Sequence, residues 1–271
     1  MAIIGAILGD IVGSHYEFRG QRPKDFDHNS SPFFTEGNKF TDDTVLSIAT
    51  KAAIIDNPDN PNFAKFYKEF GNKYMFVGYG GRFRQWLLLD EQKSYGSFGN
   101  GSAMRVSYVA DHYDSLEDVI KYATMSAECT HDHPEGIKGA IVTAGCIWCA
   151  KHGLNKNKIY EYAIEQYPKD KYRFSPELSL DDIKDKYRWN DICQDSVPVA
   201  IRCVLEADSY SEFIRNCYML DCDTDTICAI GGAIAEELYT NNDTDELMSN
   251  AKFTLQKYLD EYLYNYVFNM K

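Results

Sequence analysis

The sequence predicts an all-α protein, and three observations support that prediction. Apolar residues recur at helical spacing in many segments of the 271-residue chain. Alternation of apolar and polar residues, the pattern of a strand, is hard to find anywhere. No linker divides the chain, and a chain of this length can still bury one hydrophobic core. We therefore expect one compact domain that spans residues 1–271.

The first expected helix contains Gly5, Gly9 and Gly13, which fall four residues apart and so lie on one face, with Glu17 at its end. Small residues on one face let a second backbone approach closely. By itself the spacing favours a packing role for this face, with Glu17 at a solvated helix end. Further helices are expected at residues 45–55, 63–70, 83–89, 116–128, 134–152, 156–166, 197–207, 210–218, 226–239 and 244–262. Loops are expected at residues 71–81, 94–101 and 168–191.

The composition is that of an ordinary globular protein, with 44% apolar and 25% charged residues. The formal net charge of −13 argues against bulk binding of nucleic acid, because affinity for a phosphate backbone comes from Lys and Arg. No membrane span or signal peptide is evident, so we expect a cytoplasmic protein whose eight cysteines are reduced thiols. Cys146 and Cys149 form a CxxC pair, but no second pair offers zinc spacing, and both are expected inside a buried helix.

Two expected helices begin with acidic and hydroxyl residues. Thr41-Asp42-Asp43 precedes the helix at 45–55, and Asp223-Thr224-Asp225-Thr226 opens the helix at 226–239. A helix cap needs only one short polar side chain, and adjacent buried carboxylates need a cation or a proton. Oxygen ligands of this kind suit Mg²⁺, Mn²⁺ or Ca²⁺. The spacing leaves both capping and metal binding open. It also matches the DxD motif of some nucleotide-sugar transferases, but their folds are rich in strands.

A glycine-rich loop and a histidine pair are further candidate binding features. Backbone amides at residues 96–102 could hold a diphosphate, or the segment could be a flexible turn. It lacks the Gly-Lys-Ser/Thr of a P-loop and the preceding strand of a dinucleotide-binding fingerprint. His131 and His133 have a spacing known from metal sites, but no matching ligand cluster accompanies them. We expect one histidine to line a pocket and Pro134 to open the next helix.

Five motifs, taken in order, resemble the ADP-ribosylglycohydrolase family. They lie at residues 9–17, 40–44, 99–105, 126–131 and 223–226, the last followed by 232–235. The resemblance extends from about residue 4 to residue 239. It implies a compact, orthogonal all-α bundle with a centre of two Mg²⁺ or Mn²⁺ ions.

The resemblance also implies roles for individual residues. The implied metal ligands are Thr41, Asp42, Asp43, Asp223, Asp225 and Thr226. The implied substrate-binding residues are Ser97, Phe98, Gly99, Asn100, Gly101 and His131. Glu17 matches a mobile glutamate near the metals or the ribose, and Phe98 falls where some relatives stack a tyrosine on adenine. Asp221-Cys222 replaces the Gly-Gly of many members, which could alter the loop or add a carboxylate near the metals.

The implied reaction is hydrolysis of the glycosidic bond between ADP-ribose and an acceptor, on an ADP-ribosylated protein or small molecule, with release of ADP-ribose. The metals would position the ribose and lower the pKa of an attacking water, and Asp43 or Glu17 would act as the acid or base. Hydrolysis of O-acetyl-ADP-ribose or another nucleotide sugar, and non-catalytic binding of ADP-ribose, are the alternatives. Contacts to the acceptor are expected from residues 78–84 and 168–191. The sequence leaves open the acceptor, the choice of metal and the oligomeric state.

Overall fold

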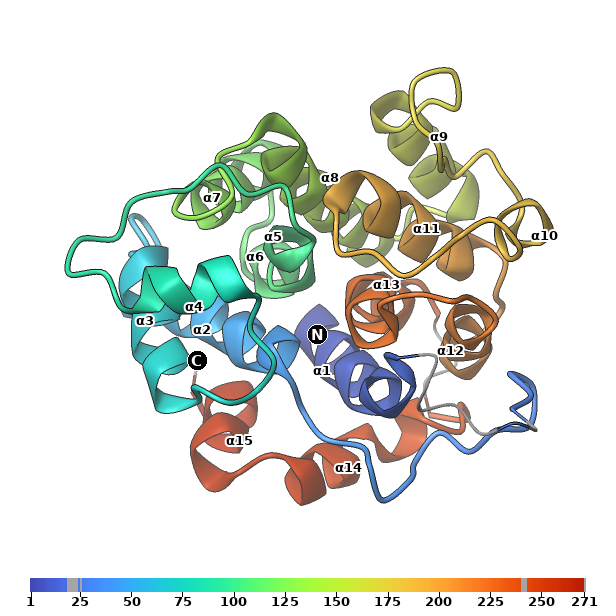
Figure 1. Ribbon diagram of the computed structural model, residues 1–271, viewed down its shortest axis with the longest axis horizontal. Coiled ribbons are helices and arrows are strands. Elements are labelled where there is room, and N and C mark those ends of the chain that lie inside the picture. The colour runs from blue at the N-terminus through green and yellow to red at the C-terminus, as the bar shows by residue number, and fades with distance from the viewer. Residues whose placement is uncertain (19–23, 25, 240–242, 271) are drawn as a thin grey trace.

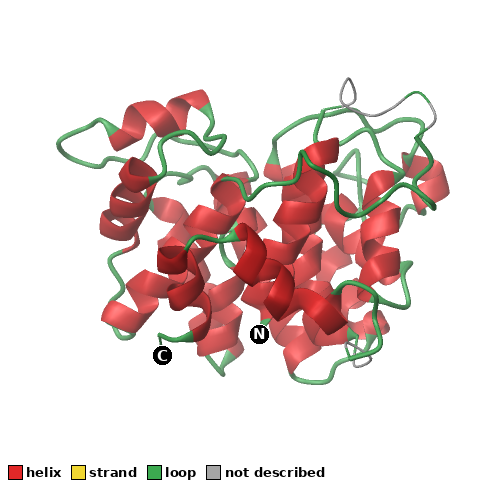
Figure 2. Cartoon of the chain, turned by 90° about the horizontal axis from the view of Figure 1, so that it is seen from below, coloured by secondary structure: helices red, strands yellow, loops and turns green. Residues whose placement is uncertain are grey.

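The computed structural model describes residues 1–18, 24, 26–239 and 243–270, and every regular element within these ranges is a helix (Figures 1 and 2). The all-α prediction is therefore confirmed. The longer helices are α1 (Ala2–Gly13), α2 (Asp42–Asp56), α3 (Phe63–Lys73), α7 (Leu116–Glu128), α8 (Pro134–Lys151), α9 (Lys156–Gln166), α11 (Cys193–Leu205), α12 (Tyr210–Tyr218) and α13 (Thr224–Leu238). The shorter ones are η1 (Ser14–Tyr16), α4 (Gly81–Leu87), α5 (Gly101–Met104), α6 (Ser107–His112), α10 (Leu180–Ile183), η3 (Met248–Asn250), α14 (Ala251–Tyr258) and α15 (Glu261–Phe268).

Helices α1 and α13 pack side by side at the centre of the molecule (Figure 1). A methyl carbon added to Gly5, Gly9 or Gly13 would lie 2.3, 2.1 or 2.6 Å, respectively, from a backbone atom of α13. The glycine face therefore serves the close packing that its spacing indicates. Because α1 is apolar on nearly every side, it is buried along almost its whole length.

Local capping explains why many helices begin where the sequence indicates. The side chains of Ser115, Asn155 and Ser209 accept hydrogen bonds from backbone amides at the starts of α7, α9 and α12. His133 caps α8 in the same way, and Pro134 is its first residue, as expected.

The prediction of one helix at residues 244–262 is wrong. That segment contains a turn, the short η3 and then α14, and a new helix begins at Glu261. The Asp245 carboxylate accepts backbone hydrogen bonds from Ser211, Leu247 and Met248, which holds the turn. Asp260 accepts a hydrogen bond from the amide of Leu263 and so starts α15. Helices α5, α6 and α10 are further elements that periodicity did not indicate, because they are too short for it.

All eight cysteines are free, and Cys146 and Cys149 lie buried in α8, as expected. Within the described part of the chain, no helix combines the length and the apolar character that crossing a bilayer would require.

Candidate active site

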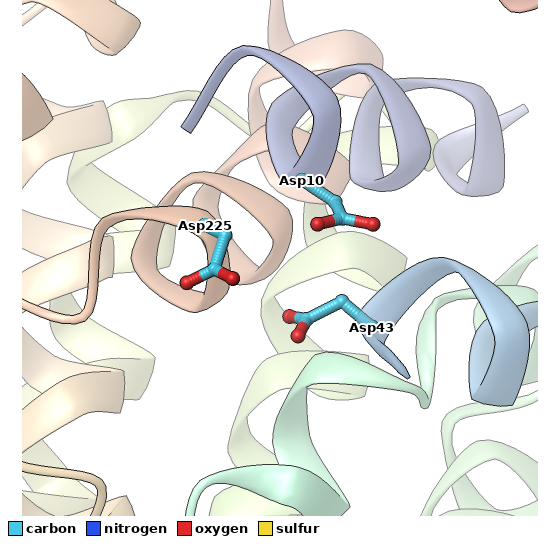
Figure 3. Close-up of side chains that lie close together, drawn as sticks. All are labelled: Asp10, Asp43 and Asp225. Atoms are coloured by element: carbon cyan, nitrogen blue, oxygen red, sulfur yellow. The ribbon is translucent and has the colours of Figure 1, made fainter. Parts of the chain in front are cut away.

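Carboxylates from three helices meet at the centre of the molecule. Asp10 comes from the end of α1, Asp43 from the first turn of α2 and Asp225 from the first turn of α13, and Figure 3 shows them pointing toward one another. One oxygen atom from each of the three lies within 4.8 Å of the others. Glu17, Asp223 and Asp225 form a second group of the same size. Among the described residues, no Lys, Arg or His forms an ion pair with any of these five.

Burial and crowding raise the pKa values of Asp10, Glu17, Asp42, Asp43, Asp223 and Asp225. Removal from water is the main cause, and it raises the pKa of Asp10 to about 6, of Glu17 to about 7 and of Asp42 to about 8. The pKa values of Asp43 and Asp225 are raised well above their ordinary range, by burial first and by neighbouring carboxylates second. Carboxylates packed in this way need protons or a cation.

A hard divalent cation fits the donor set. The Oδ1 atom of Asp43 is buried and has no hydrogen-bond partner in the described part of the chain. The neighbouring donors are oxygen atoms of carboxylates and threonine hydroxyls, the ligands that Mg²⁺ and Mn²⁺ prefer. Thr226 Oγ1 lies 3.3 Å from Asp43 Oδ2 and so joins the starts of α13 and α2.

Asp10 holds the start of α2 in place. Its carboxylate accepts hydrogen bonds from the backbone amides of Thr41 and Thr44, at 2.8 and 3.2 Å, and from both hydroxyl groups. Thr41 Oγ1 donates its hydrogen to Asp10 and accepts a hydrogen bond from the backbone N–H of Asp43 at 3.3 Å, so one of its lone pairs stays available as a ligand. Sequence reasoning missed this role for Asp10. The available signal was a single carboxylate in the otherwise apolar segment at residues 2–13.

The segment before α4 packs closely against Asp42, the first residue of α2. Asp42 donates its backbone N–H to the carbonyl oxygen of Val77 at 3.1 Å. Gly78 has a φ of +118°, and a Cβ atom added there would lie 2.9 Å from Asp42 Oδ1. Only glycine meets both requirements without strain.

The carboxylates lie in the wall of a cavity of about 250 Å³. Most of the residues predicted for the site line it: Glu17, Asp42, Asp43, Ser97, Gly99, Asn100, Gly101, His131, Asp223, Asp225 and Thr226. Two predicted residues do not. Thr41 is buried behind Asp10, and Phe98 points its ring toward that of His133, with 5.0 Å between ring centres. The proposed stacking of Phe98 on a base stays a prediction.

The loop before α5 is attached to the second acidic motif through Asn100. The side-chain amide of Asn100 donates to Asp223 Oδ2 at 2.8 Å and to Ser196 Oγ at 3.1 Å. Its backbone N–H donates to the carbonyl oxygen of Asp191 at 2.7 Å. The loop, α11 and α13 therefore hold one another in register beside the carboxylates.

The lining residues that were not predicted individually include Arg82, Tyr95, Trp189 and Asp191. Arg82 belongs to the expected acceptor segment 78–84, and Trp189 and Asp191 belong to the other, 168–191. Trp189 packs against Phe18, with ring centres 5.9 Å apart. Tyr95 lies in the loop that was expected to bind substrate, and an isolated aromatic residue in a loop gave no further signal.

Asp221-Cys222, which replaces the Gly-Gly of many family members, adds no carboxylate to the cavity wall, because Asp221 is not among the lining residues. Cys222 is buried, and its sulfur lies 3.5 Å from Thr224 Oγ1 in the first turn of α13.

Comparison with known proteins shows related sequences and a shared fold. The family model described as ADP-ribosylglycohydrolase matches residues 1–235. The protein ADP-ribosylhydrolase ARH3 of Bos taurus is 26% identical, with 88% of this chain and 83% of that protein covered. ARH3 of Homo sapiens is also 26% identical, over 88% of this chain and 84% of that protein. A solved structure titled "ADP-ribosylglycohydrolase-related protein complex" shares the fold, with a TM-score of 0.72, 18% identity, and coverage of 99% of this chain and 97% of that one.

Proposed function

Because the chain belongs to the ADP-ribosylglycohydrolase family, we propose that it is a metal-dependent hydrolase that cleaves the glycosidic bond between ADP-ribose and an acceptor. The observation that supports this most is the meeting of two acidic helix starts, α2 and α13, in the wall of one cavity. The proposed substrates are ADP-ribosylated proteins or small molecules, and free ADP-ribose is the product. The proposed cofactor is a pair of Mg²⁺ or Mn²⁺ ions.

The proposed ligands of the two ions are Thr41, Asp42, Asp43, Asp223, Asp225 and Thr226. When bound, the ions would supply Lewis-acid chemistry and lower the pKa of a coordinated water. Asp10 takes up the hydroxyl hydrogen of Thr41, and the amide of Asn100 holds Asp223 by a hydrogen bond of 2.8 Å. These contacts orient the ligand oxygen atoms before any ion binds.

Glu17 and Asp43 are the proposed groups for proton transfer. Glu17 is half-buried in the cavity wall, where burial and the nearby Asp223 raise its pKa to about 7. A carboxyl group with a pKa near neutrality can both release and accept a proton at the working pH. Asp43 is more deeply buried, and its Oδ1 atom has no hydrogen-bond partner among the residues that the structure describes.

The remaining cavity wall is proposed to bind the substrate. Ser97, Gly99, Asn100 and Gly101 would hold the diphosphate and ribose through backbone amides and short polar side chains. His131 would contact the same part of the substrate, and Phe98 is proposed to stack on the adenine outside the cavity.

A substrate panel tests this proposal. ADP-ribose linked to arginine, to serine, to acetate and to nucleic acid is incubated with the protein in Mg²⁺, Mn²⁺ or EDTA, and free ADP-ribose is quantified. We expect release from the arginine-linked, serine-linked or nucleic-acid-linked substrate with metal and none with EDTA. Release from the acetate-linked substrate alone would instead support the alternative, hydrolysis of O-acetyl-ADP-ribose. Asp225→Ala should abolish release, whereas Asp59→Asn, at an exposed turn residue, should leave it unchanged. Absence of release from every substrate with both metals would reject the proposal.

A further inference from the structure

The two ring nitrogens of His131 have different surroundings. The side chain is buried and lines the cavity. Nδ1 lies 2.7 Å from the hydroxyl oxygen of Thr130. Nε2 has no hydrogen-bond partner among the described residues and lies against the loop before α5. A Cβ atom added to Gly101 would be 3.3 Å from Nε2, and one added to Gly99 would be 3.7 Å from it.

Arg105 is fully buried beside Thr130, and it is also among the residues that line the cavity. Its Nη2 atom donates to Thr130 Oγ1 at 2.8 Å and to the carbonyl oxygen of Ser126 at 2.9 Å. The guanidinium carbon lies 4.1 Å from the ring centre of Tyr67. Within the described ranges, no carboxylate forms an ion pair with Arg105. Because a guanidinium can only donate, Thr130 Oγ1 is the acceptor in its contact with Arg105.

The single hydroxyl hydrogen of Thr130 must then go to another atom. Accepting a hydrogen bond from a cation polarises a hydroxyl group and makes it a stronger donor. The imidazole nitrogen at 2.7 Å is a good acceptor, and the nearby thiol of Cys129 is a weak one. The hydrogen therefore points to Nδ1 of His131. A neutral imidazole that accepts at Nδ1 carries its own hydrogen on Nε2.

Burial and two neighbouring cations keep this imidazole neutral. Burial is the main reason that the pKa of His131 lies well below its ordinary value, and the positive charges of Arg105 and Arg82 lower it further. Tyr95, whose ring centre lies 6.1 Å away, and Cys129, next to Thr130, are further titratable neighbours, whereas the carboxylate of Asp132 accepts hydrogen bonds from Ser94 and Gly96. Burial raises the pKa of Tyr95 and of Cys129. Both are neutral near pH 7.

We propose that Thr130, oriented by Arg105, fixes His131 as the tautomer with its hydrogen on Nε2 and so directs one N–H donor into the cavity. Thr130 and Arg105 are thus positioning residues. The donor suits an oxygen acceptor on the ligand, either a phosphate or a sugar hydroxyl. The assignment of that ligand as ADP-ribose rests on the proposed function, whereas the tautomer is a property of the free protein.

The tautomer can be measured without ligand by NMR of protein labelled with ¹⁵N in its six histidines, with His131→Gln to assign the signals. We expect His131 to be neutral at pH 7, with its hydrogen on Nε2. Thr130→Val removes the hydroxyl group and should abolish this preference, and Thr130→Ser should restore it. Thr143→Val makes the same chemical change in α8, at a buried hydroxyl group that has no hydrogen-bond partner among the described residues. This control should leave the tautomer unchanged.

Three results would overturn the proposal: a hydrogen on Nδ1 of the unaltered protein, an imidazolium at pH 7, or an unchanged tautomer in Thr130→Val. The first two results are measured on the unaltered protein. The proposal can therefore be refuted even if Thr130→Val does not fold. Arg105→Met removes the positive charge beside Thr130 and His131. The pKa of His131 should then rise, so that its imidazole becomes protonated at a higher pH than in the unaltered protein.

Calorimetric titration with ADP-ribose in Mg²⁺ then measures the effect on binding. Thr130→Val should weaken binding about tenfold, the usual scale for losing a hydrogen bond to a charged group, and Thr130→Ser should not. If the unaltered protein does not bind ADP-ribose, the proposed function fails, and the NMR result still decides the tautomer. If Thr130→Val loses the tautomer but binds as tightly as the unaltered protein, the positioning role is wrong.

Discussion

Gly9 lies where α1 and α13 approach most closely, and Gly9→Ala tests whether that approach builds the acidic cluster. The added methyl carbon would lie 2.1 Å from the carbonyl oxygen of Cys228, a backbone atom that cannot rotate away. Overpacking costs about 3 kcal/mol or somewhat more when backbone must shift, and alanine in place of glycine inside a helix returns about 1 kcal/mol. The net destabilisation is therefore about 2 kcal/mol or more.

Thermal and urea unfolding of the metal-free protein measures this cost. For a chain of this size, about 2 kcal/mol corresponds to a fall in Tm of about 4–8 °C. Metal affinity should fall as well, because Asp10 follows Gly9 directly and Asp225 begins the facing helix. Gly81→Ala is the matched control, since a Cβ atom there meets nothing within 4 Å. A stability of Gly9→Ala within about 0.5 kcal/mol of the unaltered protein would refute the reasoning.

Three further predictions concern the metals and the substrate. Asp225→Ala should weaken Mg²⁺ or Mn²⁺ binding by more than about 100-fold, because removing a residue that only hydrogen-bonds to a metal ligand already weakens metal binding about 10–100-fold. If calorimetry shows an unchanged metal affinity, Asp225 is not a ligand. Without metal, stability should fall as the pH rises from about 4 to 8 and level off above that, because Asp10, Glu17 and Asp42 have pKa values of about 6, 7 and 8 in the folded protein and there hold protons that the unfolded chain releases near pH 4. Mg²⁺ at about 100 times its Kd should add about 2.7 kcal/mol, and its affinity should rise over the same pH range; an affinity independent of pH would contradict the raised pKa values. Trp189→Ala should change the free energy of unfolding little, because the side chain is 43% exposed, but should raise KM for the substrate; an unchanged KM would place the acceptor elsewhere.

Several helices could be predicted to the residue from local sequence. The helices α7, α9 and α12 have the expected bounds because a Ser or Asn precedes each one and caps it. The C-terminal segment could not be predicted in this way. Its helical periodicity continues through Asp260, but that carboxylate caps a new helix, and Asp245 accepts hydrogen bonds from Ser211 in a distant helix.

The acidic motifs of the site could also be read from the sequence, because two helix starts with paired carboxylates exceed what capping requires. Their partner Asp10 could not be assigned a role in that way. A lone carboxylate in an apolar helix does not indicate which residues it contacts. Thr41, which donates a hydrogen bond to Asp10, lies 31 residues away in the chain. Nor could the sequence place Trp189 and Tyr95 in one cavity wall, because they come from separate loops.

The sequence by itself determined the helical class, most helix starts and the oxygen-rich chemistry of the two acidic motifs, because these depend on side chains within a few residues of one another. Only the tertiary structure decided that the glycine face of α1 packs on α13 and brings Asp10, Asp43 and Asp225 within 4.8 Å of one another. It also decided the environment of His131, which depends on a buried arginine 26 residues earlier in the chain. Burial and through-space charge set the protonation of such groups, and neither quantity can be read from local sequence.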